Sequence, residues 1–199
     1  MASATAPTNL QSPRQRLSTR QAQTVAALLD GAIDELRRVG YDGLSLRSVA
    51  KRAGVTPTTA YTYFSSKDHL VTEVFWRRLD DQPNERSSAS STIDRVMSAL
   101  DQLAAMVCAE PTLARACAVA MLGPDPDVQR LRSRIGAELH QRMADAADGD
   151  LSDDALAALN LLISGALVNA GMGHLDYDDL AAELRRTSRL ILRGDRDVH

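Results

Sequence analysis

The chain has 199 residues, 44% of them hydrophobic and 25% charged, which is typical of a globular protein and leaves room for one or two small domains. Its net charge of −3 argues against a uniformly basic nucleic-acid binder, but the basic residues are unevenly distributed. No run of about 18 apolar residues and no apolar leader is found, so we expect a cytoplasmic protein without a membrane partner.

Residues 1–17 are rich in Ser, Thr, Ala, Pro and Gln and are expected to form an N-terminal arm without fixed structure. Arginines in this region could enter a DNA minor groove or simply remain solvated. Ser18 and Gln21 have the spacing of a capping box and predict the start of a helix, which Gly40 should end. Its apolar stripe consists of Val25, Leu29, Ala32, Ile33 and Leu36.

The segment from Leu44 to Phe64 predicts two short helices joined by a tight turn. Ser45 can cap the first helix, and Gly54 can adopt the left-handed backbone that the turn needs. Thr56 and Pro57 then provide an N-cap and a first-turn proline for the second helix. The closeness of the two helices indicates a helix-turn-helix.

The second helix should bury Ala60 and Phe64 and expose a surface of hydroxyls and rings. Such a surface suits a DNA major groove, although a buried two-helix corner with a polar outer face has the same spacing. Nine basic and four acidic residues occur between Ser12 and Lys67, a net of +5 that leaves −8 for the rest. The candidate DNA-binding residues are Arg47, Thr56, Pro57, Thr58, Thr59, Tyr61, Thr62, Tyr63 and Lys67.

Several motifs resemble the DNA-binding domain of TetR-family transcriptional regulators, without gaps from about Val25 to Leu79. They are Gly40-Tyr41, Ser45-Leu46-Arg47-Ser48-Val49-Ala50, Ala53-Gly54-Val55-Thr56, Tyr61 and Phe64-Ser65-Ser66-Lys67-Asp68-His69-Leu70. The sequence departs from the family pattern at Ala60, where a larger aliphatic residue is usual, and at Thr58, where glycine is frequent. The resemblance implies a connecting helix, residues 67–80, through which ligand binding moves the DNA-reading helices.

The remaining sequence is a succession of helical patterns, and no strand pattern is found. A polar loop at Asp80–Ser91 precedes a helix that Pro111 ends, followed by a short apolar helix over Leu113–Leu122. Gly123-Pro124-Asp125-Pro126 breaks the chain before a longer amphipathic helix. Ser152 can cap the next helix, and the last covers roughly Tyr177–Leu192.

We therefore expect an all-α protein with a three-helix DNA-binding domain (18–66), the connecting helix and a larger helical domain (92–193). The larger domain would bind an effector. It would also dimerise, since its last two helices have surplus apolar surface that a second copy could cover. The candidate dimer residues are Leu159, Ile163, Leu167, Leu184 and Ile191; the alternative is that they close the monomer's core. The candidate effector residues are Met97, Leu100, Met106, Met121, Leu122, Ile135 and His140, a set equally compatible with plain core.

Nothing in the sequence indicates catalysis, a metal site or a cofactor. Cys108 and Cys117 fit neither a zinc knuckle nor a CxxC redox site, and the four histidines are scattered. The hypothesis is a homodimeric repressor that a small lipophilic effector releases from a palindromic double-stranded DNA operator. Two other classes stay open: a DNA-binding regulator without an effector, and a helical binding protein or enzyme whose helix-turn-helix is only structural.

Overall fold

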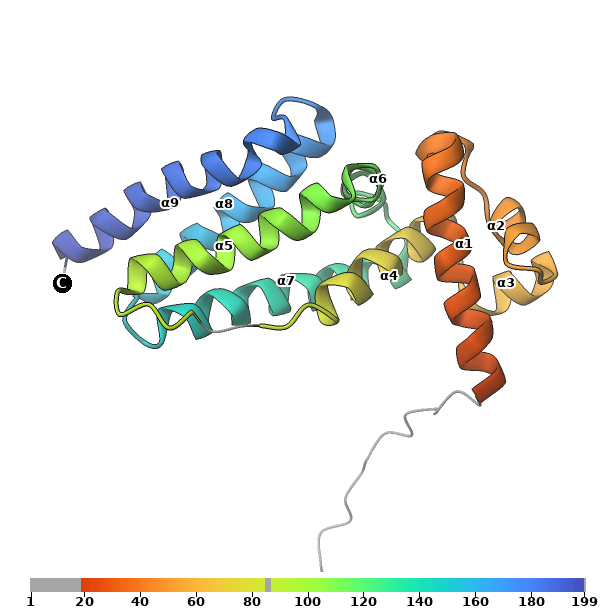
Figure 1. The fold of residues 1–199 in the computed structure, drawn as a ribbon, viewed down its shortest axis with the longest axis horizontal. Helices are drawn as coiled ribbons and strands as arrows, with labels where there is room; N and C mark the ends of the chain where they lie inside the picture. The colour runs from red at the N-terminus through yellow and green to blue at the C-terminus, as the bar shows by residue number, and fades with distance from the viewer. Residues whose placement is uncertain (1–18, 85–86, 199) are drawn as a thin grey trace, which may run out of the picture.

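The computed structural model describes residues 19–84 and 87–198, and within them every regular element is a helix (Figure 1). The all-α class is therefore confirmed for this part of the chain. Its helices are α1 (Thr19–Gly43), α2 (Leu46–Arg52), α3 (Pro57–Tyr63), α4 (Lys67–Asp80), α5 (Thr92–Ala109), α6 (Pro111–Ala120), α7 (Pro126–Ala147), α8 (Asp153–Met172) and α9 (Tyr177–Val198).

One end of the molecule consists of α1, α2 and α3 (Figure 1). Leu28 of α1 and Val49 and Ala50 of α2 are completely buried where these helices pack together. Gly40 interrupts α1 with a φ of 69° and a ψ of 179°, as the sequence predicts, but helical turns resume as far as Gly43. The proposed cap Ser18 and the arm 1–17 lie outside the described residues.

Helix α4 joins the two ends of the molecule. It packs against α1 on one side and against α6 and α7 on the other, and it buries Leu70, Val74 and Leu79. Arg142 of α7 reaches its C-terminal end and donates hydrogen bonds to the carbonyl oxygens of Leu79 at 2.6 Å and of Gln82 at 3.1 Å. The Leu79 carbonyl oxygen also accepts from the backbone N–H of Gln82 at 3.2 Å, so Arg142 adds charged donors to the turn that follows α4.

The larger domain is a bundle in which α5, α7, α8 and α9 follow the long axis of the molecule, while α6 lies crosswise near α1 (Figure 1). Helices α5 and α6 meet at 97° because Pro111 begins a new helix there. Helix α6 ends at Ala120, two residues before the predicted end, since Gly123 and Pro124 prevent another turn.

Candidate nucleic-acid interface and effector domain

Local contacts fix the starts of α2 and α3 and the turn between them. The Ser45 hydroxyl accepts from the backbone N–H of Ser48 at 3.1 Å, and the Ser48 hydroxyl accepts from that of Ser45 at 3.3 Å, which completes a capping box. Gly54 has a φ of 69°, a conformation that favours glycine. The Thr56 hydroxyl then accepts from the backbone N–H of Thr59 at 3.2 Å and caps α3. The predicted helix-turn-helix is confirmed.

Helix α3 has one buried and one exposed side. Ala60 and Phe64 are buried, whereas the Tyr61 side chain is 59% exposed. Tyr63 is half-buried against the core, so the prediction that it points largely outward is wrong. It lies three residues after Ala60, at the edge of the same face. The exposed candidates on and before α3 are Thr56, Pro57, Thr58, Tyr61 and Thr62, and Thr59 is half-buried.

Two basic candidates flank α3 and differ in their surroundings. Arg47 is exposed, whereas Lys67 is half-buried and donates a hydrogen bond to the Tyr41 carbonyl oxygen at 2.9 Å. The Lys67 ammonium also lies 4.2 Å from the centre of the Tyr41 ring. Burial and a hydrogen bond to Asp68 raise the pKa of Tyr41. Lys67 is thus held in place and keeps donors for a phosphate.

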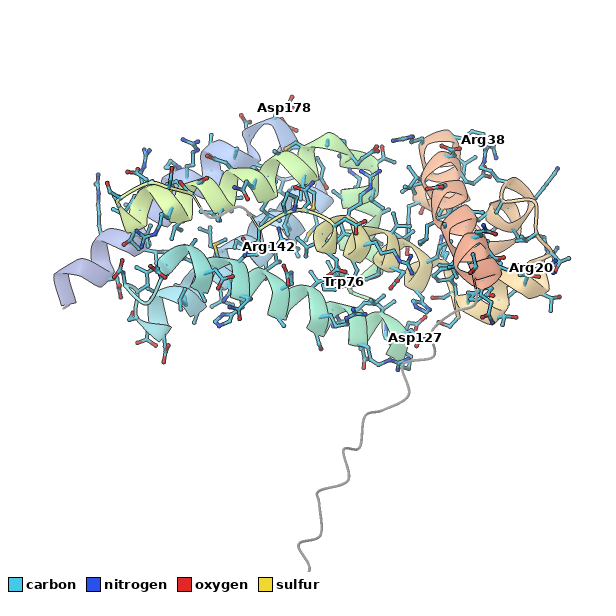
Figure 2. All side chains as sticks on the ribbon, turned by 60° about the horizontal axis from the view of Figure 1, so that its bottom comes forward. Arg20, Arg38, Trp76, Asp127, Arg142 and Asp178 are labelled. Atoms are coloured by element: carbon cyan, nitrogen blue, oxygen red, sulfur yellow. The ribbon has the colours of Figure 1, made fainter. Side chains whose placement is uncertain are left out.

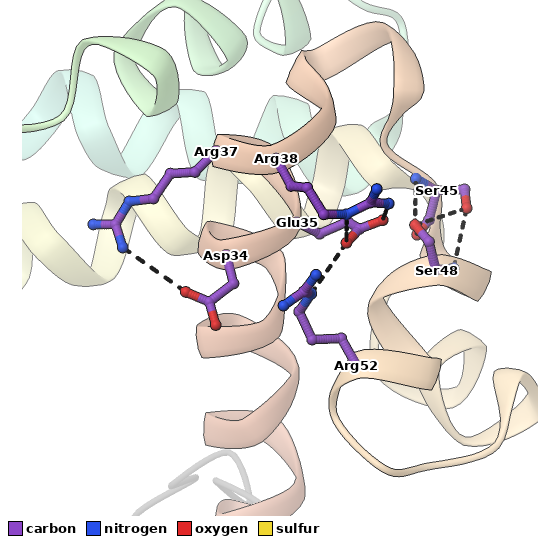
Figure 3. A network of polar contacts seen from close by, with 7 residues as sticks. All are labelled: Asp34, Glu35, Arg37, Arg38, Ser45, Ser48 and Arg52. Atoms are coloured by element: carbon purple, nitrogen blue, oxygen red, sulfur yellow. Dashed lines mark hydrogen bonds and ion pairs between the residues drawn. The ribbon is translucent and has the colours of Figure 1, made fainter.

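A buried carboxylate joins α1 to α2, and the sequence analysis did not identify it (Figure 3). Glu35 is only 3% exposed and accepts hydrogen bonds from Arg38 at 2.7 Å and from Arg52 at 3.0 Å. The bond from Arg38, aided by Arg52, lowers the pKa of Glu35 from 4.5 to about 2 against the effect of burial. The sequence offered one indication of this buried carboxylate, because Glu35 is an acidic residue between Ala32 and Leu36 of the apolar stripe.

Arg20 lies in the first turn of α1 (Figure 2). It helps to line an open groove against the start of α3, together with Thr24, Val55 and Thr56. The positive charge near the groove therefore comes from α1 as well as from the helix-turn-helix.

The effector candidates do not form one lining. Met97, Leu100, Met106 and Ile135 are buried in the bundle, and Met121 is half-buried. Leu122 is 69% exposed and His140 is exposed, with a 2.7 Å hydrogen bond to Asn160. An interior pocket cannot include these last two residues in this conformation, and that part of the prediction is wrong. Leu122 lies beyond the end of α6, which explains its exposure.

One small pocket, about 130 Å³, lies elsewhere in the larger domain. It is formed around the start of α5 and the end of α7 and includes Asn84, Arg95 and Ala146. Arg95 also donates to the Ala146 carbonyl oxygen at 2.9 Å. None of the predicted effector residues lines this pocket.

The structure corrects the candidate dimer residues. Leu159, Ile163 and Leu184 are at most 1% exposed because they fill the core of the monomer, and they cannot touch a second copy in this conformation. Leu167 and Ile191 are half-buried. The large apolar side chains that α8 and α9 expose are instead Leu161, 75% exposed, Met172 at the end of α8, 57% exposed, and Leu190, 61% exposed. Helical spacing alone could not distinguish the two faces, because α8 is apolar nearly all round.

Helix α8 is long and apolar enough to cross a membrane by length and composition, although 28% of its apolar window is buried in the monomer. This corrects the expectation that no segment reaches that level of apolar character. Its buried side packs against α6, α7 and α9. Its other side is apolar surface that the monomer leaves uncovered.

The cysteines occupy separate environments. Cys117 is buried, and burial raises the pKa of its thiol. Cys108 is half-buried and its thiol donates to the Tyr177 carbonyl oxygen at 2.9 Å. Among the residues that the structure describes, no group of three or more His, Cys, Asp or Glu side chains could hold a metal ion.

Comparisons with known proteins agree with this geometry. The family model for bacterial regulatory proteins of the tetR family matches residues 28–74. The chain is 41% identical over 177 residues to an HTH-type transcriptional regulator of Mycobacterium tuberculosis, covering 88% of this chain and 83% of the relative. It is 26% identical over 184 residues to the HTH-type transcriptional repressor KstR of Rhodococcus jostii, covering 89% and 86%. A crystal structure of a TetR transcriptional regulator from a Rhodococcus species superposes with a TM-score of 0.72 at 26% identity, covering 87% of this chain and 97% of that chain. The protein belongs to the TetR family of bacterial transcriptional regulators.

Proposed function

We propose that this protein is a homodimeric repressor that binds a palindromic operator and leaves it when a small lipophilic effector binds. The observation that carries the proposal is the exposed side of α3, where Thr58, Tyr61 and Thr62 are presented by a buried anchor of Ala60 and Phe64. The name of the relative KstR, a repressor, supports repression rather than activation.

In the proposed complex each subunit places α3 in a major groove, and the two copies of α3 are separated by about one DNA turn, roughly 34 Å. Thr56, Thr58, Thr59 and Thr62 would face base edges. Contacts to phosphates would come from the basic groups beside α3 and from tyrosine hydroxyls, and these determine affinity more than sequence preference. The residues proposed for phosphates are Arg47, Tyr61, Tyr63 and Lys67.

Dimerisation is proposed to use the outer side of α8 and α9 around Leu161 and Leu190. Both side chains are more than half exposed, and each lies beside half-buried apolar neighbours, Leu162 and Ile191. Two copies of this pair of helices would form a four-helix interface. The half-buried candidates Leu167 and Ile191 would lie at the margin of this interface. The buried candidates Leu159, Ile163 and Leu184 would pack beneath it in the core of each subunit.

The effector is proposed to enter the bundle among Met97, Leu100, Met106 and Ile135. These side chains are apolar, and methionine adapts readily to a new neighbour, so the site would favour an aliphatic compound with few charges. Such a ligand releases DNA only by preferring a conformation whose reading helices no longer match the groove spacing. A hundredfold preference corresponds to about 2.7 kcal/mol.

A second candidate function is a DNA-binding regulator that needs no effector. The burial of the four residues above favours it, because none of them lines the small pocket near Arg95. Trp76 discriminates between the two. It lies on α4 with the Arg134 guanidinium of α7 4.3 Å from its ring, so movement of α7 relative to α4 should change its fluorescence.

The decisive experiment selects fragments bound by the purified protein from a genomic library. The proposal expects a palindromic motif whose half-sites lie one turn apart. A lipophilic library is then screened by Trp76 fluorescence and by loss of operator binding. Recovery of no enriched sequence in dilute buffer would refute DNA recognition, and a recovered operator with no responsive compound would favour the second candidate.

A further inference from the structure

The segment Gly123–Pro126 connects α6 to α7, and DNA binding as described so far gives it no role. Pro124 and Pro126 restrict their own φ angles, and a residue before proline is held in an extended conformation. Asp125 accordingly has a φ of −57° and a ψ of 124°. Its carboxylate is therefore presented on a stiff support rather than on a flexible loop.

Asp125 contacts the start of two helices that belong to different ends of the molecule. One carboxylate oxygen accepts from the backbone N–H of Asp127 at 2.8 Å and caps α7. The other accepts from the hydroxyl of Ser66 and, at 3.3 Å, from that of Ser65. Ser66 is itself the N-cap of α4, because its hydroxyl accepts from the backbone N–H of His69 at 3.0 Å.

His69 supports this junction from the side of α4. Its Nδ1 accepts from the backbone N–H of Ser65 at 3.2 Å and therefore carries no proton for the carboxylate oxygen of Asp127 that lies 3.6 Å away. The His69 ring also meets the ring of Phe64 edge to face, with 5.3 Å between the centroids. Phe64 is the C-cap of α3. Ser65 and Ser66, which lie between the end of α3 and the first turn of α4, are thus connected through Asp125 to the N-cap of α7.

We propose that Asp125 is a positioning residue for DNA reading, which holds the α3–α4 corner (residues 64–69) from the effector domain. Charge-assisted hydrogen bonds are stronger than neutral ones, and a corner held in advance loses less conformational freedom when α3 enters the groove. Movement at the start of α7 would then reach α3 directly, in addition to any path through the length of α4. The inference rests on the proposed operator binding.

Asp125→Ser tests this role. Serine keeps an oxygen that can cap α7, but its side chain is too short to reach Ser66. We expect about tenfold weaker binding to the selected operator, with an unchanged dependence on salt because no phosphate contact is lost. Plain electrostatics predicts the opposite sign, since removal of a carboxylate near DNA should strengthen binding. Operator affinity equal to or above that of the unmodified protein would overturn the proposal.

The matched control is Asp150→Ser. Asp150 lies in the loop between α7 and α8, at the opposite end of the bundle, and accepts from the Thr92 hydroxyl at 2.6 Å and from Arg95 at 2.9 Å (Figure 1). The Asp150→Ser variant loses carboxylate hydrogen bonds, as Asp125→Ser does, but leaves the α3–α4 corner unchanged. Its operator affinity should match that of the unmodified protein, and an equal loss in both variants would refute a specific role for Asp125.

Amide hydrogen exchange measures the corner without DNA and separates this inference from the proposed function. Exchange in residues 64–69 should be about tenfold faster in Asp125→Ser than in Asp150→Ser. Ser66→Asp gives a second test, because aspartate still caps α4 but repels Asp125. Faster exchange in both variants would support the role of Asp125 in holding the α3–α4 corner, even if no operator were recovered. Exchange equal to that of Asp150→Ser in both would refute it.

Discussion

Glu35 shows how one residue can connect two helices of a small domain. It is buried on α1, yet both of its arginine partners keep contact with water, with Arg38 59% and Arg52 36% exposed. The charges therefore remain partly hydrated while the carboxylate oxygens are satisfied, which avoids the cost of a fully buried ion pair. Loss of the Glu35 carboxylate would remove the bond that joins α1 to Arg52 of α2. The attachment of α2, and of the turn that orients α3, would then be weaker.

Glu35→Gln should lower the free energy of unfolding by about 1.5–3 kcal/mol at pH 7, as expected for lost hydrogen bonds to a charged group. The pKa of Glu35 falls from 4.5 to about 2 in the folded protein, so the ionised carboxylate stabilises the fold above pH 4.5. That contribution disappears as the pH falls toward 2. Urea unfolding across this range should show the difference between protein and variant shrinking with acid. Glu183→Gln, which removes a more exposed helical pair with Arg186, is the control and should change stability by less than about 0.5 kcal/mol.

Arg47 and Thr58 test the proposed division between phosphate and base contacts. Arg47→Ala should weaken binding to operator and random duplexes alike and reduce the salt slope by about 1. Thr58→Ala should instead change the base preference at one position of each half-site. Titrations of both variants against operator, single-base variants and random DNA at several salt concentrations distinguish the two effects. Equal losses on all duplexes from both changes would contradict the assignment.

Individual helices show where sequence suffices and where it does not. The starts of α2, α3 and α8 were predictable because Ser45, Thr56 and Ser152 cap residues only three positions away. The turn at Gly54 was predictable for the same local reason. The burial of Leu159 and the exposure of Leu161 were not predictable. Apolar periodicity identifies an apolar side of a helix but does not say which neighbouring helix covers it. The partners of Glu35 also lie partly on another helix.

Helix α4 depends on a contact that comes from outside it. Arg142 is 9% exposed and bonds Glu138 at 2.7 Å besides the two carbonyl oxygens at the end of α4. Arg142→Met keeps much of the side-chain volume but removes the charged donor from both oxygens, of which Leu79 O retains its bond from the Gln82 N–H. The free energy of unfolding should therefore fall by about 1.5–3 kcal/mol.

Urea unfolding followed by circular dichroism measures this effect, and Trp76 fluorescence should report an altered junction between α4 and α7. Arg132→Met on the same helix is the control. Arg132 is exposed and donates to the Gly123 carbonyl oxygen, so its loss should change stability by about 0.5 kcal/mol or less. Equal effects from the two substitutions would contradict a capping role for Arg142.

At the scale of the whole molecule, repression by the proposed mechanism requires two reading helices at a fixed separation. The monomer supplies one, and it leaves Leu161 and Leu190 exposed on the side of α8 and α9 away from its core. Leu161→Glu would place a charge in the proposed interface while leaving the buried face of α8 intact. We therefore expect a folded monomer with an unchanged circular dichroism spectrum.

Because each subunit then binds its half-site alone, operator affinity should fall by about 10²–10⁴ as the advantage of simultaneous binding is lost. Sedimentation velocity measures the oligomeric state, and titration with full and half operators measures the loss. Leu122→Glu is the control, since Leu122 is 69% exposed but lies after α6. A dimer that persists in Leu161→Glu and dissociates in Leu122→Glu would place the interface at α6, and the separation of the two reading helices would then be set by that helix.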